Sequence, residues 1–252
     1  MSENAVSIGR PWVELSSVDS TNNYAMACCA GEAAVAEGTT YFAHRQTAGR
    51  GQRGRRWSAE AGENITLSVV LRPESKALPE PFLLNAAMAL GTLDFFRQAA
   101  GEKACIKWSN DLYWDDRKAG GLLIENSWRG GRWQYAVVGI GININQVVFP
   151  TDLPNPVSLR QITGQAAPVV PLARELCRCL DRRYQQLRPG HYERVMSDYT
   201  RSLYRLDQPA LYEVENETFE GIIRGVAPDG RLLLERGNTR LQLDFGAVRF
   251  VI

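Results

Sequence analysis

The spacing of apolar residues changes several times along this chain of 252 residues, and each change marks a predicted element. The clearest pattern lies in residues 81–100, where apolar side chains recur every third or fourth position, at Leu83, Ala86, Leu90, Leu93 and Phe96. That period predicts a helix with one buried stripe. Weaker patterns predict three more helices, over residues 23–34, 172–187 and 191–202. Ser20 or Thr21 is expected to cap the first of these.

Short apolar runs bounded by polar turns predict strands over residues 11–18, 40–44, 65–71, 105–108, 112–114, 121–127 and 133–144. Consecutive runs separated by short turns are typical of antiparallel hairpins. The helices bracket these strands without alternating regularly with them, which predicts an α+β domain with a largely antiparallel mixed sheet. Residues 146–171 contain five prolines and little periodicity, so we expect a loop long enough to serve a function.

Near Arg205 the pattern changes to five short strand-like runs, over residues 210–214, 219–226, 230–235, 239–243 and 248–252. Turn sequences such as Pro228-Asp229-Gly230 separate them. A series of small strands of this kind predicts a compact SH3-like β-barrel. The chain is therefore expected to form two domains, residues 1–204 and residues 205–252.

Charge and composition argue against several classes of protein. The formal net charge is only +1, whereas a protein that mainly grips a nucleic-acid backbone usually carries a larger basic excess. The five cysteines show no C-x-x-C spacing and there are only two histidines, so no zinc site is visible. Without an apolar signal segment or a run long enough to span a membrane, the sequence predicts a soluble, cytoplasmic protein.

The stretch GRGQRGRRW, Gly49 to Trp57, contains the G-x-G-x-x-G spacing of dinucleotide-binding turns. Such a turn needs a helix directly after it to hold the pyrophosphate. Only ten residues, with Gly62 and Asn64 among them, lie between Gly54 and the strand predicted at Ile65, which is too few for that helix. The alternatives are a flexible loop whose arginines hold phosphate and a solvated arginine turn paired with surface acids.

A second candidate region is Lys107 to Glu125, KWSNDLYWDDRKAGGLLIE. It places Lys107 at a strand end and Lys118 before a glycine pair, and lysines so placed suit a site where charge builds on a phosphoryl group. A surface ion pair with the neighbouring aspartates is the structural alternative. Asn143 lies within the apolar strand GIGINI, where its amide must find a partner, either a ligand or the backbone.

Taken together, these segments resemble the biotin–protein ligases. The resemblance runs in order through DSTN (19–22), QTAGRGQRGRRW (46–57), KWSNDLY (107–113), RKAGG (117–121), GIGIN (139–143) and the barrel-like tail. It implies a catalytic domain related in architecture to class II aminoacyl-tRNA synthetases, followed by an SH3-like domain. It also implies that biotin and ATP react to biotinyl-5′-AMP, with Mg²⁺, before biotin passes to a lysine of a biotin carboxyl carrier protein.

The resemblance assigns roles to particular residues. In the biotin site it places Ser20, Thr21, Asn22, Gln46, Arg50, Gly51, Gln52, Lys118 and Gly121. Near the nucleotide it places Arg53, Arg55, Trp57, Lys107, Asn110 and Asn143. The catalytic candidates are Lys118, Lys107 and Asp111. We expect Asp111 to orient or deprotonate the acceptor lysine, unless it only bonds the turn or pairs with a nearby lysine. The sequence gives no metal ligand.

Two residues depart from the family pattern. Gln52 stands where some members carry arginine, so we expect this chain to rely on Arg50, Arg53 and Arg55 instead. Ser109 replaces the usual proline of K-W-P-N-D, which is expected to loosen that turn slightly.

The DSTN segment begins at residue 19, which leaves no room for the N-terminal DNA-binding domain of the members that are also repressors. We therefore expect a ligase that does not bind DNA, and we leave a homodimer open. The competing predictions are a lipoate–protein ligase, whose R-G-x-x-G-G-G pattern is missing here, and a non-catalytic RNA-binding module.

Overall fold

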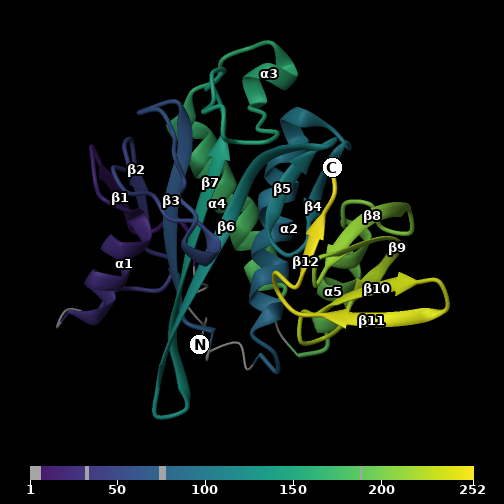
Figure 1. Cartoon of the computed structure of the whole chain (residues 1–252). Helices are drawn as coiled ribbons and strands as arrows, with labels where there is room; N and C mark the ends of the chain where they lie inside the picture. The colour runs from purple at the N-terminus through teal and green to yellow at the C-terminus, as the bar shows by residue number, and fades with distance from the viewer. Residues whose placement is uncertain (1–6, 32–33, 74–77, 188) are drawn as a thin grey trace.

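The computed structural model describes residues 7–31, 34–73, 78–187 and 189–252 of the chain (Figure 1). The strands of its larger sheet are β1 (Trp12–Leu15), β2 (Thr40–Ala43), β3 (Asn64–Leu71), β4 (Ala104–Lys107), β5 (Asp111–Trp114), β6 (Arg117–Arg129) and β7 (Arg132–Asn143). They are ordered β1-β2-β3-β7-β6-β5-β4. Only β1 and β2 pair in parallel, which confirms the predicted largely antiparallel mixed sheet.

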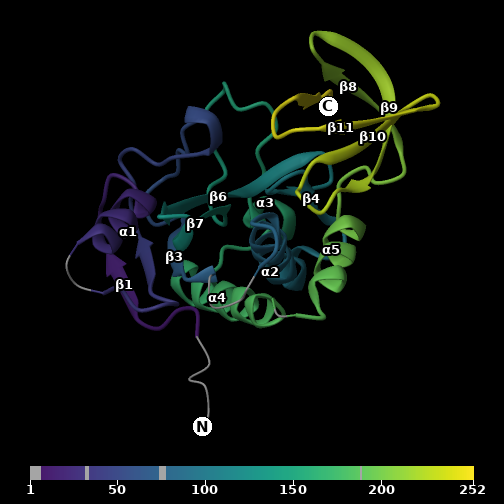
Figure 2. The ribbon, with the colours of Figure 1, turned by 90° about the horizontal axis from the view of Figure 1, so that it is seen from below.

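Two faces of this sheet are buried in different ways. Helices α2 (Phe82–Ala100) and α4 (Val169–Gln185) cover one face, as Figure 2 shows. A Cβ on Gly91 of α2 would lie 2.9 Å from the Cα of Leu180, so the glycine allows the two helices to approach closely. Helix α1 (Thr21–Ala30) packs on the other face, against Tyr41, Val70 and Val137. Side chains alternate between faces along each strand, so neighbouring residues serve the two layers in turn.

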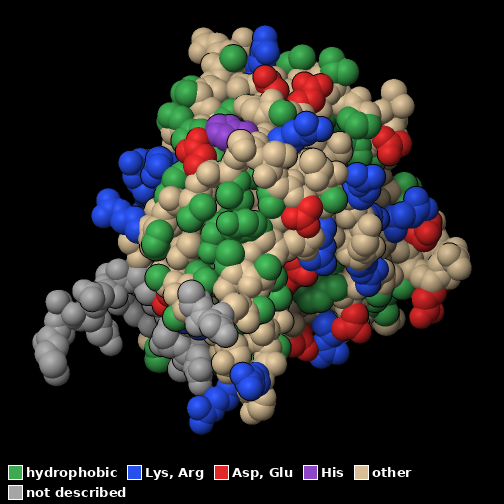
Figure 3. Space-filling view, turned by 90° about the vertical axis from the view of Figure 1, so that its left-hand side faces the viewer, with side chains coloured by type: hydrophobic (Ala, Val, Ile, Leu, Met, Phe, Trp, Pro, Cys, Tyr) green, Lys and Arg blue, Asp and Glu red, His purple; other side chains and the backbone are tan. Residues whose placement is uncertain are grey.

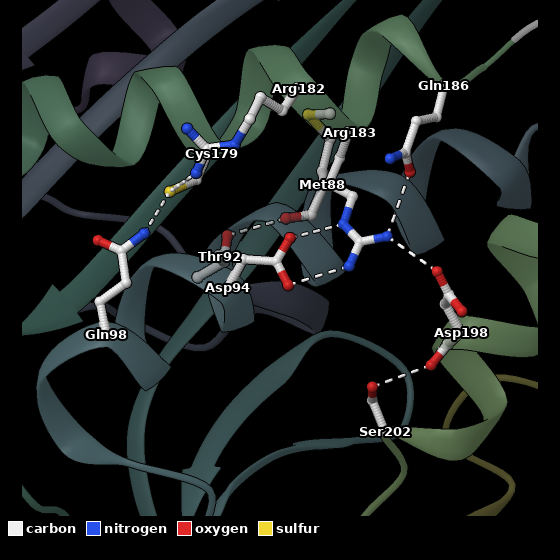
Figure 4. A network of polar contacts seen from close by, with 10 residues as sticks. All are labelled: Met88, Thr92, Asp94, Gln98, Cys179, Arg182, Arg183, Gln186, Asp198 and Ser202. Carbon is white, nitrogen blue, oxygen red and sulfur yellow. Dashed lines mark hydrogen bonds and ion pairs between the residues drawn. The ribbon is translucent and has the colours of Figure 1, made fainter.

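The helices α2, α4 and α5 (Tyr192–Arg201) are joined by one partly buried arginine (Figure 4). Arg183 donates from Nε and Nη2 to the two carboxylate oxygens of Asp94, at 2.6 and 3.0 Å, and from Nη1 to Asp198 at 3.0 Å. Burial tends to raise the pKa of Asp198, but hydrogen bonds from Arg183 and Arg201 outweigh it and lower that pKa. The network is part of the scaffold.

The structure corrects four details of the predicted helices. Ser20 occupies the N-cap position of α1, but its side chain makes no capping hydrogen bond, and the helix ends at Ala30 because Gly31 caps it. The predicted loop over 146–171 contains a short helix, α3 (Leu159–Thr163), which opens with a capping box at Ser158. Its last part belongs to α4, because Pro168 and Pro171 lie at the start of that helix, where a missing N–H costs nothing.

The C-terminal strands form a second, antiparallel sheet. They are β8 (Pro209–Val214), β9 (Glu217–Val226), β10 (Leu232–Arg236), β11 (Thr239–Leu243) and β12 (Val248–Phe250), ordered β11-β10-β9-β8-β12. The five predicted strands are confirmed, but within the described residues β11 and β12 do not pair, so the barrel is not closed. Phe245 stacks on Trp108 with ring centres 5.1 Å apart, and the Trp108 indole donates to the carbonyl of Gly230 at 3.0 Å. These contacts fasten the small sheet to the end of β4.

The edge of the large sheet at β1 is free of a further strand within the described part of the chain. Figure 3 shows the side of the molecule that carries β1 and α1, where hydrophobic side chains gather between charged ones. Tyr24 of α1 is 37% exposed. Over the described ranges, no helix combines the length and apolar character that crossing a membrane requires.

Candidate active site

Three glycines form the floor of the candidate site on the face of the sheet that carries α1. Gly121 of β6 pairs directly with Gly141 of β7, and Gly139 lies two residues before Gly141 on the same face. A Cβ on Gly139 would lie 2.2 Å from Oδ1 of Asn22, and one on Gly141 would lie 2.4 Å from the Trp57 ring. The GIGIN segment therefore carries glycine because an amide and an indole lie directly on the strand.

The start of α1 contributes a buried polar cluster above this floor. Asn22 accepts a hydrogen bond at Oδ1 from the Ser68 hydroxyl at 2.6 Å, and Ser68 also bonds the Thr21 hydroxyl at 2.7 Å. Gln46 accepts at Oε1 from the backbone N–H of Thr21 at 2.7 Å and from its hydroxyl at 3.1 Å. Ser20 is buried beside them. The structure thus brings together Ser20, Thr21, Asn22 and Gln46, four of the residues predicted to lie in the biotin site, and adds Ser68, which sequence reasoning missed.

The stretch from Gly49 to Trp57 is a compact loop with one short 3₁₀ turn, η1 (Gln52–Gly54). No α-helix lies between this turn and β3. This confirms that it is not a dinucleotide-binding turn. The Gly51 N–H donates to the Arg55 carbonyl at 2.7 Å, and Trp57 N–H donates to Gly49 at 2.9 Å. A Cβ on Gly49 would lie 2.4 Å from the Trp57 carbonyl oxygen, so this position requires glycine. The loop has a defined shape that closes over Gly141 through Trp57.

The arginines of the loop point to different partners. Arg50 forms an ion pair with Glu125 of β6 and donates to Asn23 at 2.8 Å. Arg53 reaches the C-terminal sheet and donates to the backbone carbonyls of Phe245 and Gly246. Neither Glu125, nor Asn23, nor these carbonyls could be recognised as partners from the sequence pattern.

Arg55 and Gln52 are two of the exposed residues of the loop. Within the part of the chain that the structure describes, neither side chain makes a hydrogen bond or ion pair. Of the loop arginines predicted to hold phosphate, Arg55 is thus the one whose guanidinium is not occupied by a carboxylate or a carbonyl in this structure.

Trp57 adds an unusual feature. Its indole Nε1 is buried and finds no hydrogen-bond partner among the described residues. A buried indole N–H normally donates to something, because leaving it unpaired costs free energy. A ligand acceptor placed over Gly141 would satisfy it, which fits the prediction that Trp57 lies at the nucleotide.

Lys118 and Asp111 form the charged end of the site. Lys118 Nζ lies 2.6 Å from Asp111 Oδ1, and the side chains are 35% and 28% exposed. A β-bulge in the pairing of β5 with β6 turns Lys118 toward the face that carries Gly121 and Asp111. A Cβ on Gly121 would lie 2.9 Å from Asp111 Oδ1, so the glycine makes room for this pair. The aspartate pairs with the lysine, as the structural alternative foresaw.

Lys107 lies on the same face, opposite Asp111 in the pairing of β4 with β5. Its Nζ donates to the Tyr113 hydroxyl at 3.1 Å and lies 5.0 Å from the ring centre of Phe250 in the C-terminal sheet. Burial, together with the nearby cations Lys118, Arg205 and Arg55, lowers the pKa of Lys107 to about 8, against the attraction of Asp111. Four cationic groups therefore act on one small region.

The two predicted asparagines are both buried and bond the backbone. Asn110 donates to the carbonyl of Leu122 at 2.5 Å, which holds the turn before β5 against β6. Asn143 donates to the carbonyl of Val157 at 3.1 Å, which fixes the segment after β7. That segment runs beside Lys118, whose backbone N–H donates to Asn155 at 2.8 Å. Their observed role is to position backbone around the lysine.

No three His, Cys, Asp or Glu side chains come together as a metal site anywhere in the described residues. The region contains four cations and one carboxylate, namely Arg55, Lys107, Lys118 and Arg205 with Asp111. This excess of positive charge favours an anionic ligand over a resident cation.

Known proteins resemble both parts of the chain. The model of the biotin/lipoate A/B protein ligase family matches residues 15–143, and that of the biotin protein ligase C-terminal domain matches residues 210–250. A biotin--[acetyl-CoA-carboxylase] ligase of Paracoccus denitrificans is 33% identical over 227 residues, which cover 87% of this chain and 92% of that protein. The bifunctional ligase/repressor BirA of Bacillus subtilis is 30% identical over 204 residues, 79% of this chain. The chain spans 62% of the length of that relative.

Solved structures agree on the fold. The biotin protein ligase from Aquifex aeolicus in complex with biotin and ATP superposes with a TM-score of 0.80 at 23% identity, over 95% of this chain and 99% of that one. With one family model matching residues 15–143 of 252, and a relative 33% identical along 92% of its length, the chain belongs to the biotin/lipoate A/B protein ligase family.

Proposed function

We propose that the protein is an ATP-dependent biotin–protein ligase, which activates biotin as biotinyl-5′-AMP and transfers it to a lysine of a biotin carboxyl carrier protein. The observation that carries the proposal is the arrangement on one sheet face of a buried polar cluster at one end and the Lys118–Asp111 pair at the other. The relatives named as biotin ligases and the fold shared with the Aquifex aeolicus structure support it.

In the proposed first step, a carboxylate oxygen of biotin attacks the α-phosphorus of ATP. The bond from that phosphorus to the pyrophosphate oxygen breaks, pyrophosphate leaves, and a mixed anhydride remains. Two anions must meet, so the site has to neutralise negative charge in the bound state and in the transition state. Lys118 is proposed to do this at the carboxyl end, and Lys107, which is under the charge of both Lys118 and Arg55, would assist it. Trp57 would donate its free N–H to the nucleotide.

In the proposed second step, the amine of the carrier lysine attacks the acyl carbon, an amide forms, and AMP leaves. The attacking amine must first lose a proton from a pKa of roughly 10.4. Asp111 is the carboxylate within reach of Lys118, and it is a candidate to orient the incoming ammonium group or accept its proton. The mixed anhydride hydrolyses readily in water, so the loop over Gly141 would also protect it.

At the end of the sheet face opposite Lys118, amide and hydroxyl groups for the biotin rings would come from Thr21, Asn22 and Gln46. Residues 146–157, fixed at Asn143 and Lys118, are proposed to cover the nucleotide. Mg²⁺ is proposed to enter with ATP, because phosphate oxygens supply most of its ligands in such sites and the described residues hold no metal cluster of their own. A domain boundary after residue 204, a cytoplasmic location, the absence of DNA binding and the oligomeric state stay predictions.

Incubation with labelled biotin, Mg-ATP and an apo carrier domain tests the proposal. We expect label on the carrier that depends on ATP and on the carrier lysine, and pyrophosphate exchange that depends on biotin. Transfer of lipoate with no transfer of biotin would instead support the lipoate ligase of the same family. Neither activity, together with retention of RNA on a filter, would support a non-catalytic binding module.

A further inference from the structure

Glu125 of β6 is a partly buried carboxylate, and side chains from other parts of the site donate hydrogen bonds to both of its oxygens. Arg50 donates from Nη2 to Oε1 at 2.9 Å and from Nη1 to Oε2 at 3.1 Å, which is a bidentate pair. Asn22 donates from Nδ2 to the same Oε2 at 2.9 Å. The carboxylate therefore joins three elements: the sheet, the start of α1 and the glycine–arginine loop of residues 49–57.

The Asn22 amide is held in one orientation by these contacts. A carboxylate can only accept hydrogen bonds, so the NH₂ group must face Glu125 and the carbonyl oxygen must face the Ser68 hydroxyl. Nδ2 also donates to the Leu123 carbonyl at 3.3 Å, and Gly139 closes the remaining side. Glu125 and the Leu123 carbonyl thus set together which atoms Asn22 presents to a ligand, and Glu125 makes the shorter of the two contacts.

Arg50 is the second group that Glu125 fixes. It also donates to Asn23, whose amide in turn donates to Asp19 at 2.6 Å. Arg50 is 45% exposed and Glu125 only 23%, so the anchor is the carboxylate and the arginine is the part of the loop tied to it. Because its charge is already balanced, Arg50 does not act as a free cation for phosphate in this structure.

The position of Glu125 separates it from the reacting groups. Gly121, Leu123 and Glu125 lie on one face of β6, so Glu125 is about 13 Å along the strand from Gly121 and the Lys118–Asp111 pair. We propose that Glu125 is a positioning residue that sets the Asn22 amide for biotin and fastens the glycine–arginine loop through Arg50, so that one carboxylate couples ring recognition to loop closure. The part that concerns biotin rests on the proposed function.

The test is Glu125→Gln, which keeps the shape of the side chain and removes its charge. We expect KM for biotin to rise and the release of biotinyl-5′-AMP to accelerate, each about tenfold, as loss of a charge-assisted hydrogen bond predicts. The kcat for pyrophosphate exchange at saturating biotin and KM for ATP should stay within about twofold, because the change lies away from the phosphates. Glu213→Gln, which breaks an exposed ion pair with Arg249 in the C-terminal sheet, is the matched control.

A double variant separates the two roles. If Glu125 retains the adenylate through Arg50, Glu125→Gln added to Arg50→Met should not accelerate release further, whereas KM for biotin should still rise through Asn22. Additive effects on release, or Glu125→Gln with unchanged KM and release, would overturn the proposal. The proposal would also be overturned if Glu125→Gln lowered kcat in proportion to a lower Tm and left KM unchanged, because that result marks a merely structural role.

A measurement without substrates keeps this inference apart from the proposed function. Amide hydrogen exchange of residues 49–57 should quicken in the Glu125→Gln protein and stay unchanged in Glu213→Gln. If the wild type fails to exchange pyrophosphate, the ligase proposal falls while loop exchange still reports on Glu125. Unchanged loop exchange in an active Glu125→Gln protein would refute the coupling alone.

Discussion

Two ionic networks in this molecule use the same chemistry in different surroundings. Arg183 lies between three helices and is 17% exposed. Its guanidinium donates hydrogen bonds to Asp94, Asp198 and Gln186 (Figure 4). Arg50 and Lys118 also pair with carboxylates at hydrogen-bond distance, but they stand 45% and 35% exposed on an open sheet face.

The difference lies in what borders each network. Around Arg183 the neighbours are packed helices, whereas Glu125 and Asp111 lie on the sheet face that carries Gly121, Gly139 and Gly141. A strand glycine that carries no packing side chain weakens the sheet slightly, so three on one face are best explained by what must lie close to them. Ion-pair geometry therefore does not distinguish a functional site from a structural one. The glycines beside the Glu125 and Asp111 pairs do, because they leave space on the sheet face for other groups. The two networks should therefore fail differently when broken, one in activity and the other in stability.

The largest expected effect is that of Lys118→Ala. Removing the cation at the carboxyl end should reduce biotin-dependent pyrophosphate exchange by about 10²–10³, the range found when one stabilising group of a polar transition state is deleted. Its pair with Asp111 is partly exposed, so Tm should barely change. Lys103→Ala, which removes an exposed lysine 3.5 Å from Asp115, serves as control. Near-normal exchange in Lys118→Ala would show that the lysine has been misassigned.

Arg183→Met should give the opposite result. It leaves Asp94 and Asp198 without their shared cation, which we expect to cost roughly 2–3 kcal/mol of unfolding free energy, less than a fully buried pair because the site is partly solvated. The kcat/KM per folded molecule should be unchanged. Urea unfolding measures the change in free energy, and activity divided by the folded fraction measures kcat/KM per folded molecule. Arg201→Met, which breaks an exposed i,i+3 pair with Asp198, is the control. A loss of specific activity without a loss of stability would contradict the assignment.

Lys107 should make the use of ATP sensitive to alkaline pH. Its pKa is lowered to about 8, so the cation is present below that pH and is lost as the pH rises through it. At pH 9 about one molecule in ten would retain the charge, so kcat/KM for ATP should fall by up to about tenfold. In Lys107→Arg the guanidinium stays charged, and this alkaline fall should disappear. A fall of equal size in both proteins would assign it to another group.

Asp198 should contribute to stability only above acidic pH. Its pKa is lowered in the folded protein, so the stabilisation is complete above the unfolded value of about 3.9 and is lost as the pH falls through the folded value. The difference in unfolding free energy between wild type and Asp198→Asn should therefore shrink on acidification from about pH 6 to about pH 3. A difference that is constant over this range would mean that the charge is irrelevant.

Much of the fold follows from local pattern. The helix expected over 81–100 is observed as Phe82–Ala100, and the hairpin strands expected at 121–127 and 133–144 are observed as Arg117–Arg129 and Arg132–Asn143. Local rules fail at the start of α4, because they predict loop at its prolines although a first helical turn tolerates them. The pairing of β3 with β7 joins residues about seventy positions apart, and no local pattern carries that information.

The site shows the same division. Motif order predicted Lys118, Asp111, Asn22 and Gln46, and the structure brings them to one region of the sheet. It missed Glu125, which reads as an ordinary polar position in a strand, because its partners come from residues 22 and 50. The contact of Arg53 with the carbonyl of Gly246 spans 193 positions and was equally invisible. Contacts that depend on tertiary packing had to come from the structure.

The smallest expected effect concerns Gln52, the position where the loop lacks an arginine that some family members carry. Arg50 is held by Glu125 and Arg53 by backbone carbonyls, so Arg55 is the one of the three arginines expected to hold phosphate that is left to meet it. Gln52→Ala should therefore change adenylate release by no more than about twofold, since an exposed amide contributes little. Arg55→Ala should accelerate release about tenfold, the effect of losing one charged hydrogen bond. Single-turnover release of labelled biotinyl-5′-AMP from both variants decides the matter. Equal losses would mean that Gln52 itself contacts the ligand, and that the loop rearranges from the form observed here when the ligand binds.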